Sequence, residues 1–406
     1  MENDCVIIYG DYYEVLSVLN SFPRLYAYMS MFISDGSDFD GDFGAIPICM
    51  EDVLEDRSYR NCRIVVSDDN RFDFVVSSFS KRYHIPKKNF IRFRRWVSYM
   101  LKKYNDILLI PESVKVDVCT KCQLNCPECY MRTHNNGVLG AGYTKFSVFK
   151  DFVDRNSSIR SMDIGCNGEV FLNPELDKIL NYCHEKDIAI TMSGGTNFNT
   201  VSEKALEALV TSQVIEVCIS IDGATDDVYS QYRRNGNLNR VLRNIKKLNQ
   251  YKEKYHSEYP HLRCQFIIME SNYHQLEDIA KLAEEYHMSI YYKKEWGNHF
   301  TPEDIEYVKQ VTGLDYDESC NPNEGYCYQM IFSPQINWDG RLLGCVIVYR
   351  DDWGVNAFED GLISSLNCNR YRDAICNLLD GGNIKDLKNP CIDCNSLMYD
   401  SINMNL

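Results

Sequence analysis

Four cysteines, Cys119, Cys122, Cys126 and Cys129, lie within eleven residues of the stretch VDVCTKCQLNCPECYMR (116–132). The last three follow the spacing C-x3-C-x2-C. Three thiolates on a short, wrapping loop can hold three corners of a cubic iron–sulfur cluster and leave one iron open for another ligand. Zinc usually takes four ligands in two separated pairs, so this spacing favours iron.

The composition limits the classes of protein that this chain can belong to. Its 406 residues suit two or three domains, and its net charge is −15. The densest basic stretch (87–96) is short, so no nucleic-acid polymer is expected as a partner. No signal peptide is visible, nor any apolar run near the roughly 20 residues that span a bilayer. We therefore expect a cytoplasmic protein whose 18 cysteines form no disulfide framework.

Residues 1–105 alternate between strand-like and helix-like patterns, which predicts a Rossmann-like α/β domain. The predicted strands are 5–10, 26–34 and 62–68, and the predicted helices are 12–22 and 71–85. A dinucleotide site would need G-x-G-x-x-G after the first strand, but Gly10 is followed by Tyr12 and Val15 at the other two glycine positions. The degenerate motif favours a recognition or packing domain over cofactor binding.

Residues 113–300 contain six strand candidates separated by amphipathic helices. The strands are expected at 113–119, 161–166, 188–195, 215–222, 263–269 and 289–295. Six βα units fall short of a closed eight-stranded barrel, so we predict a partial (β/α)6 TIM barrel. The cysteine loop follows the first of these strands, at the end where α/β barrels carry their active sites.

Residues 301–406 are less regular and rich in cysteine. Asp339-Gly340 is a strong turn signal and predicts a hairpin. The hairpin would bring Cys327 and Cys345 together, and a C-x2-C pair follows at Cys391 and Cys394. We expect a small C-terminal domain in which four thiolates saturate a second metal site.

The segment CQLNCPEC (122–129) resembles the signature of radical S-adenosylmethionine (SAM) enzymes, and the resemblance extends over about 113–300. It implies a [4Fe–4S] cluster on Cys122, Cys126 and Cys129, with SAM on the open iron. In that family the reduced cluster cleaves SAM to a 5′-deoxyadenosyl radical, which abstracts a substrate hydrogen. Cys119 is then left over and is expected to be a core thiol.

Segments after the later strands extend this resemblance and imply SAM contacts. Glu169, after Gly168 in GCNGEVFLNPEL, would accept hydrogen bonds from the SAM ammonium group. Arg233 would clamp the carboxylate, with Arg234 as the rival assignment. The full set of expected cofactor-binding residues is Gly168, Glu169, Ser193, Ser220, Arg233 and Met269. The other cysteines of the barrel are expected to be buried thiols, namely Cys166, Cys183, Cys218 and Cys264.

The second cysteine set resembles the auxiliary-cluster domain of radical SAM enzymes, called SPASM in its long form and twitch in its short form. No cysteine follows Cys394, which favours the twitch form with one auxiliary [4Fe–4S] cluster. Cys368 could replace one of the four expected ligands. A zinc site on the same four cysteines is the structural alternative.

The resemblance implies a flavodoxin- or ferredoxin-type electron donor and oxidation or epimerisation of the substrate. The Rossmann-like N-terminus and the segment YHIPKKNFIRF (83–93), which resembles parts of domains attached to polysaccharide and nucleotide-sugar enzymes, favour a carbohydrate or nucleotide-sugar substrate. One alternative is a maturase that modifies a ribosomally made peptide. Another is a non-catalytic iron–sulfur or zinc scaffold. No base or hydrogen donor can be assigned among the 28 tyrosines and the cysteines.

Overall fold

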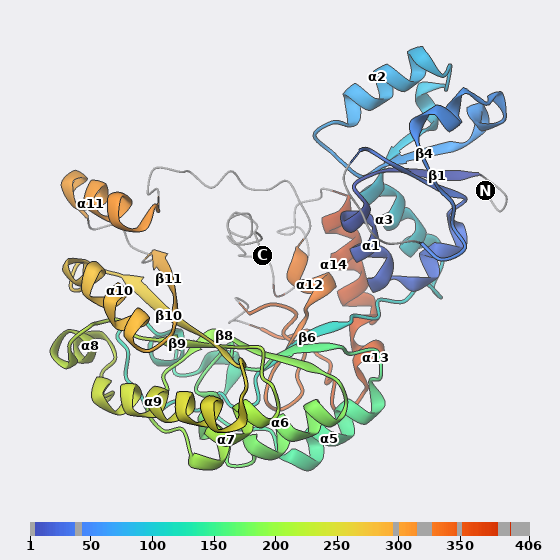
Figure 1. Ribbon diagram of the computed structural model, residues 1–406. Coiled ribbons are helices and arrows are strands. Elements are labelled where there is room, and N and C mark those ends of the chain that lie inside the picture. The colour runs from blue at the N-terminus through green and yellow to red at the C-terminus, as the bar shows by residue number, and fades with distance from the viewer. Residues whose placement is uncertain are drawn as a thin grey trace. The chain divides into compact units, whose positions relative to one another are not determined.

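The computed structural model describes residues 5–36, 43–294, 300–314, 327–346, 351–380 and 390 (Figure 1). These residues divide into two compact units. The first contains the described residues up to 112 together with 327–333 and those from 363 onward. The second contains 113–314 and the described residues of 334–362. The part of the chain that follows the barrel therefore contributes to both units.

The first unit is built on a five-stranded parallel sheet with the order β3-β2-β1-β4-β5. Its strands are β1 (Val6–Gly10), β2 (Met31–Ser34), β3 (Ile48–Cys49), β4 (Arg63–Val66) and β5 (Phe90–Arg92). Strand β1 lies in the middle, and the chain winds outward from it to either side, which is the doubly wound Rossmann order. All five residues of β1 are buried, as expected for a parallel sheet covered on both faces. The predicted Rossmann-like fold is confirmed.

Helices of the first unit cover this sheet and carry the chain back from its C-terminal part. They are α1 (Tyr12–Ser21), α2 (Phe72–Arg82), α3 (Phe93–Lys103), α12 (Tyr328–Phe332) and α14 (Asn369–Leu379), while α13 (Leu362–Leu366) lies at the boundary of the two units. Helix α14 packs on α3, where Ser98 Oγ donates to the carbonyl of Cys376 at 3.2 Å. Thus a late segment of the chain helps to build the N-terminal unit.

Two features of the first unit differ from the sequence-based expectation. The predicted strand 26–34 is a 3-10 helix over Pro23–Tyr28 followed by β2, because Pro23 stands at the first helical position, where a missing N–H costs nothing. In addition, Cys5 and Cys62 form a disulfide with Cα atoms 4.7 Å apart. Strands β1 and β4 pair with Val6 opposite Arg63, so the residues that precede them are neighbours. One disulfide is not a framework, but the cytosolic argument had not foreseen it.

The second unit is built on a seven-stranded parallel sheet with the order β11-β10-β9-β8-β7-β6-β12. Its strands are β6 (Ser113–Val116), β7 (Ser161–Asp163), β8 (Ala189–Thr196), β9 (Glu216–Ser220), β10 (His261–Ile268), β11 (Ser289–Lys294) and β12 (Gln335–Ile336). Strands β6 to β11 follow one another in chain order, which confirms the partial (β/α)6 barrel. Strand β12 then adds beside β6 from much later in the chain.

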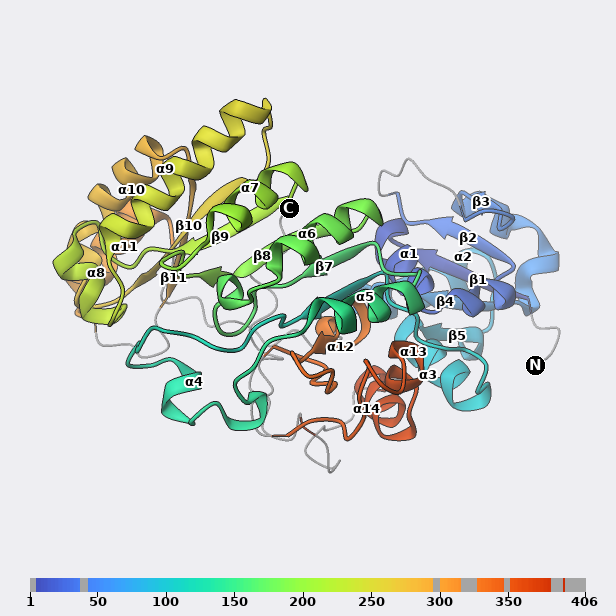
Figure 2. The same ribbon diagram turned by 90° about the horizontal axis from the view of Figure 1, so that it is seen from below.

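Helices cover the outer face of this sheet, as Figure 2 shows. They are α5 (Phe146–Arg155), α6 (Leu176–Glu185), α7 (Glu203–Thr211), α9 (Leu238–Tyr255) and α10 (Leu276–Glu285), with the shorter α4 (Tyr130–Thr133) and α8 (Asp226–Tyr232) in loops and α11 (Pro302–Thr312) after β11. Helix α9 buries Leu238, Val241, Ile245 and Leu248, an apolar stripe at helical spacing. Among the described helices, none has the length and apolarity to span a membrane.

Candidate functional site

The cysteine loop begins where β6 ends. Cys119 is fully buried and bridges to Tyr143, and burial raises the pKa of its thiol to about 11, which fits the predicted core thiol. Beyond it, Cys122 is exposed, Cys129 is half-buried and Cys126 is buried. The Cys129 N–H donates to the carbonyl of Cys126 at 3.3 Å, so the last two cysteines are joined by a tight turn.

Two N–H donors face the sulfurs of this loop. Asn197 Nδ2 lies 3.7 Å from Cys122 Sγ, and Arg233 Nη1 lies 3.8 Å from Cys126 Sγ. Hydrogen bonds to cysteine sulfur are one of the means by which proteins tune iron–sulfur clusters, because they stabilise negative charge on the thiolates. The sulfurs therefore lie in a setting that suits a cluster. This is an observation that a set of buried core thiols would not explain.

Groups of three or more His, Cys, Asp or Glu placed to hold a single metal ion do not occur among the described residues. A cubic cluster makes a different demand, because each of its three cysteines binds a different iron. Its ligand sulfurs must stand farther apart than the ligands of one zinc ion. The cysteine loop therefore suits a cluster better than a lone ion.

The segment after β7 lies directly against the cysteine loop. The Glu169 N–H donates to the carbonyl of Lys121 at 2.8 Å. Gly168 has φ +74°, and a Cβ there would stand 2.5 Å from Thr120 Cα. Only glycine allows both this backbone conformation and this approach. Gly168, an expected cofactor residue, thus fixes the loop as well.

Glu169 is completely buried beneath the same loop. Its Oε2 accepts the Asn197 N–H at 2.7 Å, its Oε1 accepts the Phe171 N–H at 3.3 Å, and burial raises the pKa of the carboxyl group to about 7. Each carboxylate oxygen can accept more than one hydrogen bond, so these contacts leave acceptor capacity. That Glu169 receives the SAM ammonium group stays a prediction.

Arg233 is the guanidinium next to the cysteine sulfurs. Its Nε pairs with Asp222, which is fully buried, and its guanidinium lies 5.3 Å from the ring centroid of Tyr232. Burial opposes the charge, but attraction to Asp222 holds the pKa of Arg233 above its usual range. The rival residue, Arg234, contributes its backbone carbonyl, which accepts the Asn125 N–H at 2.9 Å. Of the two side chains, that of Arg233 faces Cys126.

The three other expected SAM contacts have partners of their own. Ser193 Oγ donates to Asp163, Ser220 Oγ accepts from Gln265 Nε2 at 3.3 Å, and the backbone N–H of Met269 donates to Asn272 Oδ1 at 2.8 Å. All three lie at the carboxyl ends of their strands, as predicted, but no hydrogen bond among the described residues joins them to the cysteines. Their roles toward SAM stay predictions.

Two residues close to the sulfurs were not foreseen. Asn197 joins Cys122, Gln123 and Glu169, and Asp222 holds Arg233 and accepts the Ile267 N–H at 2.8 Å. Both lie in segments that carry the family resemblance, TMSGGTN and SIDG. Position within those segments was the available signal, but only the folded strand ends show what these side chains touch.

The predicted turn at Asp339-Gly340 is present. The Gly340 N–H donates to the carbonyl of Asn337 at 2.9 Å, and Ile336 bridges Leu342 in antiparallel fashion. Cys345 follows this hairpin and is buried, whereas Cys327 stands at the N-cap of α12 in the first unit. Cys391 and Cys394 lie outside the described residues. Cys368, the possible substitute, is the N-cap of α14.

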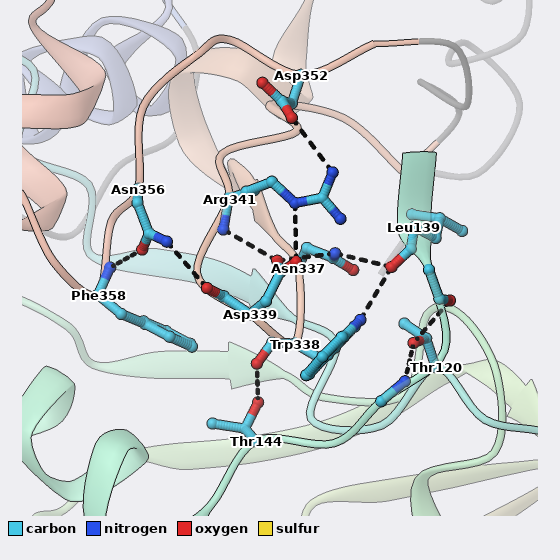
Figure 3. A network of polar contacts seen from close by, with 12 residues as sticks. Thr120, Leu139, Thr144, Asn337, Trp338, Asp339, Arg341, Asp352, Asn356 and Phe358 are labelled. Carbon is cyan, nitrogen blue, oxygen red and sulfur yellow. Dashed lines mark hydrogen bonds and ion pairs between the residues drawn. The ribbon is translucent and has the colours of Figure 1, made fainter. Parts of the chain in front are cut away.

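The hairpin is fixed against the segment that follows the cysteine loop (Figure 3). Trp338 Nε1 and Asn337 Nδ2 each donate to the carbonyl of Leu139 at 2.9 Å. Thr144 Oγ1 donates to the carbonyl of Trp338 at 2.7 Å. Leu343 also packs on Met131 and Leu139, beside the partly buried Cys129. The chain that leads to Cys345 is thereby attached to the first cysteine loop.

Known proteins share this arrangement. No protein-family model matches the chain. The mycofactocin maturase MftC of Mycobacterium tuberculosis is 22% identical over 192 residues, which is 47% of this chain and 46% of that protein. A probable GTP 3′,8-cyclase of Methanocaldococcus jannaschii is 25% identical over 182 residues, which is 42% of this chain and 54% of that protein. The chain thus spans about half the length of the curated relatives it matches.

Among solved structures, Streptococcus suis SuiB bound to the precursor peptide SuiA superposes with a TM-score of 0.53 at 15% identity, covering 76% of this chain and 80% of that one. This likeness supports the fold. Motif, fold and relatives together identify the chain as a member of the radical SAM family, with a C-terminal part of the SPASM or twitch type. The cofactors expected from the sequence, a SAM-binding [4Fe–4S] cluster, SAM and an auxiliary cluster, are those of this family.

Proposed function

We propose that this radical SAM protein is a maturase that modifies a peptide. The observation that carries the proposal is the match of its barrel segment to mycofactocin maturases, with which it shares 22% identity over 192 residues. The fold of SuiB, a protein solved with its precursor peptide, agrees with it. These relatives favour the peptide alternative over the carbohydrate or nucleotide-sugar substrate expected first.

In this proposal Cys122, Cys126 and Cys129 hold the first cluster. When reduced and bound to SAM, that cluster supplies a 5′-deoxyadenosyl radical, with the electron coming from a flavodoxin- or ferredoxin-type donor. Asn197 and Arg233 direct N–H groups at two of the three sulfurs, at 3.7 and 3.8 Å. Asp222 fixes the Arg233 side chain, and Glu169 fixes the backbone of Asn197. Every one of these groups is placed before any ligand arrives, which lowers the cost of ordering the site.

The interior of the barrel suits a polar substrate. Along β6 the buried Val114 and Val116 alternate with the half-buried Ser113 and Lys115, so the polar side chains share one face of the strand. Lys115 Nζ lies 3.8 Å from Asp163 on the next strand. On the far side, Arg263 pairs with Glu216 at 2.7 Å. Charged groups of both signs are what a peptide backbone with polar side chains would meet.

The auxiliary cluster of the proposal would be held by Cys327, Cys345, Cys391 and Cys394. The hairpin attached to the first cysteine loop places Cys345 in the same unit as the first cluster's ligands. Replacing Cys391 and Cys394 by Ala is then expected to leave SAM cleavage intact while abolishing substrate turnover. Unchanged iron content in that variant would contradict the assignment of these two cysteines.

The test is substrate-dependent cleavage of SAM. The chain is reconstituted with iron and sulfide without oxygen, reduced, and supplied with SAM and one of two substrate sets. One set holds peptides encoded by short reading frames beside the gene, and the other holds nucleotide sugars. We expect 5′-deoxyadenosine together with a mass change in a peptide, and neither product in the Cys122/Cys126/Cys129→Ala variant. Turnover of nucleotide sugars alone would overturn the peptide assignment while leaving the radical SAM class intact.

A further inference from the structure

A cavity of about 590 Å³ lies in the first unit, away from the cysteine loop. It forms at the amino ends of the strands, where Val6 begins β1, Ser30 precedes β2 and Arg63 begins β4. The Val6 N–H donates to Ser30 Oγ at 3.1 Å, which satisfies the backbone at the floor. Small-molecule sites typically have volumes of about 300–1,000 Å³, so this cavity has the size of one.

Aromatic rings form much of its wall. Trp96, Tyr99 and Lys103 follow one another on α3 at helical spacing, and Trp96 is nearly buried while Tyr99 is 36% exposed. Opposite them, Tyr28 and Tyr104 stack with centroids 4.9 Å apart and an angle of 29° between the rings. Rings whose faces and edges border a cavity favour a flat, apolar ligand.

The charged groups of the lining are all cations. Arg63 and Lys103 border the cavity, and none of its lining residues is Asp or Glu. Lys103 Nζ lies 4.8 Å from the Tyr104 ring centroid, and within the described part of the chain neither cation has a carboxylate partner. In a chain of net charge −15, two cations without carboxylate partners beside one cavity favour an anionic ligand.

The other edge of the same sheet does not offer such a site. After β1, Asp11 caps α1 by accepting the Glu14 N–H at 2.8 Å, so an amide that could bind phosphate is already used. Glu14 itself adds a second carboxyl group there. An anion is therefore disfavoured at the carboxyl edge, where Rossmann domains usually bind one, and favoured at the amino edge.

We propose that the cavity bordered by Tyr28, Arg63, Trp96, Tyr99, Lys103 and Tyr104 binds a small ligand in which an aromatic ring is joined to a phosphate or carboxylate group. The rings receive the flat part, and the two cations receive the anion. Two sources share this chemistry, a nucleoside monophosphate and an aromatic carboxylic acid. The site is independent of the SAM cluster and of the peptide substrate.

The test is isothermal titration calorimetry on the full chain, with adenosine 5′-monophosphate and indole-3-acetate as separate probes and adenosine and indole as their uncharged counterparts. We expect one charged probe to bind and its uncharged counterpart to bind at least tenfold more weakly. Which of the two charged probes binds identifies the source. Binding of neither, or equal binding of charged and uncharged forms, would overturn the proposal.

Variants locate the binding in the cavity. Arg63→Gln with Lys103→Gln is expected to weaken binding at least tenfold, whereas Lys87→Gln with Lys88→Gln, which removes two exposed cations elsewhere in the unit, should leave it unchanged. Lys103→Gln and Tyr99→Ala alter exposed side chains only and serve if the double variant does not fold. Affinity that survives in all cavity variants would place the ligand elsewhere. SAM cleavage should be the same in every variant, so this test and that of the proposed function fail separately.

Discussion

The chain contains two parallel sheets whose first strands end in opposite ways. After β1 the backbone turns through Gly10 and Asp11, Ser67 Oγ accepts the Asp11 N–H at 3.3 Å, and Glu14 fills the edge. A Cβ at Gly10 would stand 1.9 Å from Ser67 Oγ, so this turn is closed by its neighbour. After β6 the chain instead runs into a loop of three cysteines faced by amide and guanidinium N–H groups.

This difference shows that a parallel sheet alone does not make a site at its carboxyl edge. Both edges gather loops, as the fold demands. In the first unit the donors and acceptors at the edge satisfy one another. In the second, the sulfurs are held by scaffold residues that leave them available to a cluster. The contrast predicts that substitutions at the second edge affect chemistry, whereas those at the first affect only stability.

The largest expected effect comes from the cysteines themselves. Replacing Cys122, Cys126 and Cys129 by Ala should lower the iron content from about eight to about four atoms per chain, since one [4Fe–4S] cluster is lost, and should abolish SAM cleavage. Iron analysis and low-temperature electron paramagnetic resonance with and without SAM measure both. Cys119→Ala is the matched control, because this neighbouring cysteine is fully buried and should leave both properties intact. SAM cleavage by the triple variant would break the comparison.

Arg233 provides the next effect. Arg233→Met leaves the fully buried Asp222 without its cation, so we expect a loss of about 3–5 kcal/mol in the free energy of unfolding. Urea denaturation measures it. Arg234→Met is the control, because Arg234 holds the cysteine loop through its backbone carbonyl, which the substitution keeps. Equal losses in the two variants would show that the Asp222 pair does not stabilise the edge.

Gly168 tests the close approach of the two loops. Gly168 and Gly313 have almost the same φ, +74° and +73°, but a Cβ at Gly313 meets nothing within 4 Å. Gly313→Ala should therefore cost only the backbone term, about 1–2 kcal/mol. Gly168→Ala should cost about 1–3 kcal/mol more, because its Cβ would overlap Thr120, and should also reduce iron incorporation. Similar losses in both variants would mean that the loop adjusts freely.

The sequence predicted those parts of the fold that depend on local patterns. Strands β6 to β11 alternate with amphipathic helices, so periodicity predicted the partial barrel. Strand β12 was missed as a member of this sheet, because Gln335–Ile336 is too short to show a period and pairs with a strand more than two hundred residues earlier. Pairings of that kind depend on tertiary packing rather than on local preference.

The same distinction applies to the site. The spacing of Cys122, Cys126 and Cys129 predicted the loop, since the ligands of one cluster are close in the sequence. Asn197 and Asp222 follow other strands, and their contacts with the loop and with Arg233 exist only once the strand ends converge. The closed edge of the first sheet was anticipated in part, because the missing glycines after Gly10 argued against a cofactor, but the carboxyl group of Glu14 was not recognised there.

Glu14 provides the smallest effect and tests the closed edge directly. Burial raises the pKa of its carboxyl group to about 7. The folded state then holds a proton that the unfolded state releases near pH 4.5, so the associated stability is present below that pH and is lost as the pH rises through about 7. Glu14→Gln mimics the protonated form and should raise stability at pH 8 by about 1–2 kcal/mol while changing little at pH 4. Urea denaturation at both values measures this. Because Glu14 lies far from the cysteine loop in function, SAM cleavage should not change, and a variant that gained stability but lost cleavage would show that the two edges are coupled.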